Sequence, residues 1–164
     1  MKKVLPAILI IMAAVSMLSI SSCKKGKDGK PGNANVTSQT FSVPTWSSNS
    51  TRWYISLSVP EITSGNISSA AIQVYFSIDN NSWTALPNTV VASTNYFMGY
   101  ITAVGTVQVN WDYNGIGIGS SPNSFYSATS LFKVVVIPPA AIAANPDLDL
   151  NNYNKVKMKF NLQD

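Results

Sequence analysis

The chain has 164 residues, of which 46% are hydrophobic and 11% are charged, and it contains no histidine and one cysteine. Without histidine there is no Ser-His-Asp triad and no histidine-ligated zinc site, and one cysteine cannot form a disulfide within the chain. From Asn33 onward, five basic and six acidic side chains give a net charge of −1, although the whole chain carries +4. The composition therefore gives no reason to expect nucleic-acid binding.

The first 23 residues have the layout of a secretory signal. Two lysines follow Met1, residues 4–18 form an apolar run, and Ser-Ile-Ser-Ser leads into Cys23. A charged start, an apolar middle and small residues before a cleavage point are typical of a signal peptide. The alternatives are a retained membrane span, for which 15 apolar residues are short of the roughly 20 required, and a plain secretory signal with a chance cysteine.

The end of this segment resembles a bacterial lipobox, which ends in the cysteine that becomes lipidated. The resemblance implies that Cys23 receives a diacylglycerol, that the bond after Ser22 is cut, and that the new amine can be acylated. Two or more acyl chains, such as palmitate, anchor a protein stably to a membrane. We therefore expect residues 1–22 to be a lipoprotein signal peptide. The mature chain would be held in the bacterial cell envelope, at the outer membrane, on its periplasmic or its surface face.

Residues 23–35 are predicted to be a flexible tether. Gly26, Gly29 and Gly32 recur at a period of three, with a proline before the last of them. This is collagen-like spacing, but three glycines are too few for a stable triple helix. Chance spacing in a Gly/Lys linker is the alternative.

The remaining residues, 36–164, are predicted to form one β-rich domain. Short segments of β-branched and aromatic residues with partial alternation are separated by Pro, Gly and Asn turn signals. The predicted strands are 36–43, 52–59, 70–78, 83–86, 95–104, 106–113 and 131–137. Segments 95–104 and 106–113 flank Gly105 as a hairpin, and residues 114–123 form a Gly-rich loop. Short strands at this spacing predict a mainly β fold, an antiparallel β-sandwich.

Two segments have patterns that differ from those of the other predicted strands. Residues 131–137 are nearly all apolar, which predicts a central strand covered on both faces. Residues 150–162 fit two structures. Their strict alternation predicts a strand, whereas Tyr153, Val156 and Phe160 also fit one face of a short helix that Asp149 or Asn151 would start.

With these features the chain resembles a group of uncharacterised bacterial lipoproteins. The members have a lipobox, a collagen-like Gly-x-y tether and a β-rich C-terminal domain that opens with Asn-Ala-Asn-Val. That opening stands here at 33–36, and similar motifs are Val-Pro-Glu-Ile-Thr at 59–63, Val-Val-Ile-Pro at 135–138 and Leu-Asn-Asn-Tyr-Asn-Lys-Val at 150–156. The resemblance implies a short amphipathic helix at the C-terminus, which we adopt over the strand, and it implies no activity.

The acidic residues give little indication of catalysis or metal binding. Glu61 is the only glutamate, whereas a glycosidase needs two positioned carboxylates, so we expect no enzyme. Asp147, Asp149 and Asn151 match the first three oxygen ligands of a calcium loop, but Asn152 replaces its glycine and methionine replaces its final glutamate. A polar turn with a helix cap is the simpler interpretation. We expect no metal and no cofactor.

One aromatic cluster is a candidate ligand site. Trp111, Asp112 and Tyr113 lead into the Gly-rich loop that ends near Gly119, where aromatic rings and a carboxylate could bind a polar ligand such as a glycan. Most aromatic residues of a β domain are instead core residues or cross-strand pairs.

The sequence therefore predicts a lipid-anchored, non-catalytic structural or interaction module of the cell envelope, with a glycan or an envelope protein as its partner. The alternative is a glycan-binding surface lipoprotein that uses exposed aromatic residues. A glycan binder needs two or more exposed aromatics together, whereas an enzyme needs two acidic residues in one pocket.

Overall fold

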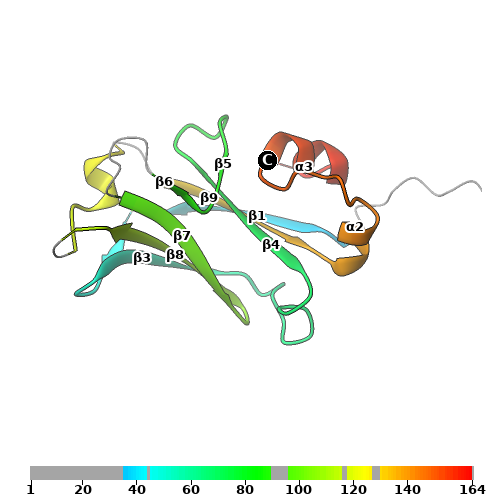
Figure 1. The fold of residues 1–164 in the computed structure, drawn as a ribbon, viewed down its shortest axis with the longest axis horizontal. Coiled ribbons are helices and arrows are strands. Elements are labelled where there is room, and N and C mark those ends of the chain that lie inside the picture. Colours follow the sequence, from blue (N-terminus) through cyan, green and yellow to red (C-terminus); the bar gives the residue numbers. More distant parts are fainter. Residues whose placement is uncertain (1–34, 44, 90–95, 116–117, 127–129, 164) are drawn as a thin grey trace, which may run out of the picture. The chain divides into compact units, whose positions relative to one another are not determined.

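A computed structural model describes residues 35–43, 45–89, 96–115, 118–126 and 130–163. Cys23, the signal segment and most of the tether lie outside the described residues. The described chain forms two antiparallel sheets and three short helical segments (Figure 1). No helix in these residues is both long enough and apolar enough to cross a membrane.

The first sheet has the strand order β1-β9-β4-β5, and the second has the order β2-β3-β8-β7-β6. The first contains β1 (Thr37–Val43), β9 (Ser130–Ile137), β4 (Ala71–Ser77) and β5 (Thr84–Ala85). The second contains β2 (Ser47–Ser48), β3 (Arg52–Ser58), β8 (Thr106–Tyr113), β7 (Tyr96–Ala103) and β6 (Asn88–Thr89). All neighbouring strands pair antiparallel. The predicted mainly β sandwich is confirmed.

The main core fills the space between the two sheets. Alternate residues of each strand point inward, as the pleat of a β-strand requires. Val107, Val109 and Trp111 of β8 are completely buried there, opposite Phe132 and Val134 of β9. The predicted hairpin is β7 and β8, and Gly105 at its turn has a φ of 74°, a conformation that glycine adopts without strain.

Strand β9 is covered on both faces, as its composition predicted. Its other face carries Val135 and Ile137, which pack against helix α3 (Tyr153–Phe160). Figure 1 shows α3 on the side of β4 and β9 that faces away from β3, β7 and β8. The buried residues of this second core are Val36, Tyr75, Val135, Ile137, Ala141, Tyr153, Val156, Phe160 and Leu162. The C-terminal helix is confirmed, and the strand alternative for residues 150–162 is wrong.

Local signals fix both ends of α3. Asn152 caps its start by accepting a hydrogen bond from the Lys155 N–H at 3.1 Å. Asn161 ends the helix in the left-handed conformation, with a φ of 52°, which asparagine tolerates better than most residues. The apolar residues at the helical spacing of three and four therefore face β9.

Several short elements were not predicted. Strands β2 and β6 have two residues each, too few to show alternation. Helix α2 (Pro139–Ala143) begins at the second proline of a pair, because a proline at the first helical position already has a helical φ. The predicted loop at 114–123 contains the start of a 3-10 turn, η1 (Pro122–Ser124), which the Ser121 hydroxyl caps.

Substitutions on α3 test its helical packing. Phe160 is 3% exposed and Met158 is 76% exposed, although the two would share a face in a strand. Phe160→Ala should lower the free energy of unfolding by about 3–5 kcal/mol, the usual loss for a buried phenylalanine. Met158→Ala should change it by less than about 0.5 kcal/mol. Urea denaturation measures both values, and equal losses for the two variants would contradict the helix.

Candidate functional site

The predicted ligand cluster does not come together as a binding surface. Trp111 is 0% exposed and lies in the core between the sheets, where its ring is 5.1 Å from that of Tyr96 and 5.3 Å from that of Phe125. The prediction that Trp111 binds a ligand is therefore wrong, because a buried indole offers no face to a sugar.

The other two members of the cluster lie on opposite faces of β8. Asp112 points outward, and its carboxylate is 3.1 Å from the guanidinium of Arg52, its cross-strand neighbour. Both groups are well exposed, so this ion pair contributes little to stability. Tyr113 points inward, with its ring 4.9 Å from that of Tyr96. Asp112 and Tyr113 therefore cannot act on one ligand.

The Gly-rich loop packs against this aromatic cluster. The Tyr96 hydroxyl accepts a hydrogen bond from the Ser120 N–H at 2.6 Å. At Gly119 the backbone has a φ of 72°, and a Cβ atom would lie 2.8 Å from both Tyr113 and the Tyr96 hydroxyl. These aromatic rings are part of the main core or pack against it, which is a structural role.

This packing predicts a difference between two glycines. Gly119→Ala should lower the free energy of unfolding by about 1–3 kcal/mol, because alanine is strained at that φ and its Cβ meets two rings. Gly65→Ala should be close to neutral, because its Cβ would meet only the Thr63 hydroxyl, at 3.8 Å. Urea denaturation of both variants is the measurement. A neutral Gly119→Ala would mean that the loop does not pack as described.

The acidic residues that the structure describes lie apart from one another in groups smaller than three. Within the described ranges, no three His, Cys, Asp or Glu side chains lie close enough to hold a metal ion. Glu61 lies in the turn after β3, where its backbone carbonyl accepts a hydrogen bond from the Asn66 side chain at 2.8 Å. Asp149 accepts a hydrogen bond from the Asn151 N–H at 3.0 Å, and its other oxygen is 3.8 Å from the Lys155 ammonium. This segment is a polar turn before a capped helix.

A buried lysine was missed by the sequence analysis. Lys133 of β9 is 0% exposed, and its ammonium donates a hydrogen bond to the Tyr153 hydroxyl at 2.8 Å. The same ammonium is 4.6 Å from the centre of the Trp83 ring and 4.7 Å from that of Tyr153. Aromatic faces attract a cation at this distance. The available signal was a lone lysine in an otherwise apolar strand.

Tyr75 of β4 connects this cluster to the loop before α3. Its ring lies 5.0 Å from that of Tyr153, and its hydroxyl donates a hydrogen bond to the Leu150 carbonyl at 2.6 Å. Burial, followed by the neighbouring Tyr153, raises the pKa of Tyr75 far above its ordinary value. The phenol therefore stays protonated and remains a donor.

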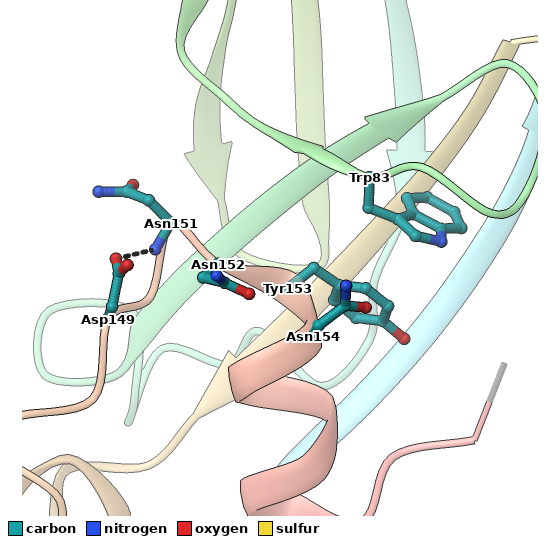
Figure 2. Close-up of a pocket in the computed structure, with 6 residues that line it drawn as sticks. All are labelled: Trp83, Asp149, Asn151, Asn152, Tyr153 and Asn154. Atoms are coloured by element: carbon teal, nitrogen blue, oxygen red, sulfur yellow. Dashed lines mark hydrogen bonds between the residues drawn. The ribbon is translucent and has the colours of Figure 1, made fainter.

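Beside these residues the surface has a hollow of about 340 Å³, which we call the α3 hollow. It is lined by Trp83, Asp149, Asn151, Asn152, Tyr153 and Asn154. Figure 2 shows Trp83 reaching from the segment before β5 toward Tyr153, with the side chains of the α3 start beside them. The lining combines one partly exposed aromatic ring, that of Trp83, with amide and carboxylate groups, whereas Tyr153 is only 3% exposed. This combination suits a small polar ligand.

The loop that carries Trp83 is held by its own acidic residue. The Asp79 carboxylate accepts hydrogen bonds from the backbone N–H groups of Ser82, at 2.8 Å, and Asn81, at 2.9 Å, and from the Ser77 hydroxyl, at 3.0 Å. These bonds, the Ser82 one foremost, lower the pKa of Asp79 to about 2. These hydrogen bonds fix the conformation of the loop immediately before Trp83.

Removal of one hydroxyl tests the link between β4 and the loop. Tyr75→Phe should lower the free energy of unfolding by about 1–3 kcal/mol, because the Leu150 carbonyl loses its partner. Tyr113→Phe is the matched control and should be near neutral, because its hydroxyl makes no hydrogen bond with the described residues. Thermal and urea unfolding of the two variants decide the matter. A neutral Tyr75→Phe would show that the loop is held in another way.

No protein-family model matches the chain, and neither the curated proteins nor the solved structures contain a similar one.

Proposed function

We propose that the protein is a lipid-anchored, non-catalytic interaction module of the bacterial cell envelope. The observation that carries the proposal is the leader: a charged start, a 15-residue apolar run and small residues that end at the only cysteine. The resemblance to bacterial lipoproteins supports the same lipid anchor, and we propose the outer membrane as its location.

The domain itself fits an interaction role better than a catalytic one. The Asp149 carboxylate accepts a hydrogen bond in its own turn and pairs with Lys155. Glu61 lies in the turn after β3, where its backbone carbonyl accepts a hydrogen bond from Asn66. Acid-base catalysis on a glycoside needs two carboxylates that face one substrate, and the described residues bring no such pair into the α3 hollow.

Glycan binding is the second candidate function, and one observation favours it. The chain presents a partly exposed tryptophan beside a group of asparagines in the α3 hollow. The tryptophan proposed to contact the glycan is therefore Trp83 and not the buried Trp111.

A cysteine variant tests the anchor. In the native host, the wild-type chain should sediment with membranes, and its mass should correspond to a chain that starts at Cys23 and carries acyl groups. Cys23→Ala should lack the mass of the acyl groups and should no longer occur in the membrane fraction as a lipidated chain. Ser22→Ala is the matched control and should behave as the wild type, because alanine is common before a lipobox cysteine. A wild-type chain without the mass of acyl groups, or equal fractionation of the wild type and Cys23→Ala, would refute the anchor.

Protease treatment of intact cells then determines the face of the membrane. Cleavage of the wild-type domain would place it on the cell surface, and protection that ends when the outer membrane is opened would place it in the periplasm. Protection that persists after the outer membrane is opened would contradict an extracytoplasmic location.

A further inference from the structure

We infer that the α3 hollow is a binding site for a neutral carbohydrate of one or two sugar rings. The inference deepens the proposed function, on which it rests for access to extracytoplasmic glycans. The volume of about 340 Å³ lies at the small end of the range for ligand pockets. A mono- or disaccharide unit, as part of a longer chain, is a ligand of suitable size.

The aromatic wall of the hollow is held in place before any ligand arrives. The Trp83 ring lies 5.5 Å from the Tyr153 ring at an angle of 53°, and the Lys133 ammonium lies near both rings. Trp83 is nevertheless only partly buried, so part of the indole remains available to the hollow. A fixed ring loses little conformational freedom on binding, which favours affinity.

The polar wall supplies both hydrogen-bond donors and acceptors. Asn151 and Asn154 are exposed, and their side-chain amides make no hydrogen bonds with the described residues. Asn152 uses its side-chain oxygen to cap α3, which leaves its NH₂ group available. An amide offers an acceptor and two donors, and a carboxylate adds further acceptors, so the set can match the hydroxyl groups of a sugar.

The charges of the hollow favour an uncharged ligand. Asp149 is its one carboxylate, and the Lys155 ammonium 3.8 Å away offsets that charge. A single carboxylate supplies at most two of the six to eight oxygen ligands that Ca²⁺ takes. An anionic ligand would meet the Asp149 carboxylate directly. Amides beside an aromatic ring, with no dominant charge, are the chemistry that recognises neutral sugars.

A titration of the full-length chain tests the inference. The protein is purified in a detergent without a sugar head group and titrated with maltotriose, cellotriose and tri-N-acetylchitotriose, with trigalacturonic acid as the anionic comparison. Isothermal titration calorimetry should give a Kd below about 1 mM for at least one neutral trisaccharide. Trigalacturonic acid should bind at least about tenfold more weakly than that trisaccharide.

Variants of the lining locate the binding. Trp83→Ala should weaken the Kd at least about tenfold, and Asn154→Ala should weaken it several-fold. Trp83→Phe keeps a ring in the second core and should bind more tightly than Trp83→Ala, which covers the case in which the alanine variant does not fold. Met158→Ala, on the same helix but outside the hollow, and Phe97→Ala, an exposed aromatic of β7, should leave the Kd unchanged.

Two results would overturn the inference: binding of none of the neutral trisaccharides, or binding that Asn154→Ala and the Trp83 variants leave unchanged. Stronger binding of the anionic sugar would also overturn the ligand class. These outcomes are independent of the anchor. A lipidated chain that binds no sugar refutes the inference alone, whereas a sugar-binding chain that lacks a lipid on Cys23 refutes the proposed function alone.

Discussion

The structure depends on the need to cover both faces of β9. This strand is apolar on the side that faces the second sheet and also on the side that carries Val135 and Ile137. Burial of each such side chain contributes about 1.5–3 kcal/mol relative to exposure. The second sheet covers one face, and α3 covers the other by placing Val156 and Phe160 against it. The C-terminal segment is thus part of the fold and not an appendage.

The same constraint accounts for the position of the α3 hollow. Once α3 lies on β9, Tyr153 at its first turn reaches the buried ammonium of Lys133, and Tyr75 holds the preceding loop through the Leu150 carbonyl. An ammonium taken out of water is costly unless hydrogen bonds and aromatic faces compensate it. Tyr153 and Trp83 are therefore held close to Lys133. The hollow lies beside them, between Trp83 and the polar residues at the start of α3.

Much of the fold could be predicted from local pattern, and the site could not. The central position of β9 followed from its apolar run, and the β7–β8 hairpin followed from a glycine between two alternating segments. Alternation could also have placed Trp111 inside, because it continues the inward series of Val107 and Val109. The α3 hollow joins Trp83 and Tyr153, which are distant in sequence, and both rings pack near the buried Lys133. No local pattern indicates that a helix of residues 153–160 packs on β9 beside the loop before β5.

The two aromatic clusters of the domain differ in one respect that matters for binding. In the main core, the rings of Tyr96 and Trp111 are buried, and Tyr113 is partly buried beside them. The backbone of the Gly-rich loop approaches these rings so closely that Gly119 has no room for a side chain. At α3, Trp83 packs against Tyr153 and also lines a polar hollow. A ring can bind a ligand only through a face that the protein leaves open. Of these two clusters, the one at α3 borders a surface hollow, and the binding inference therefore rests on it and not on the cluster around Trp111 that the sequence indicated.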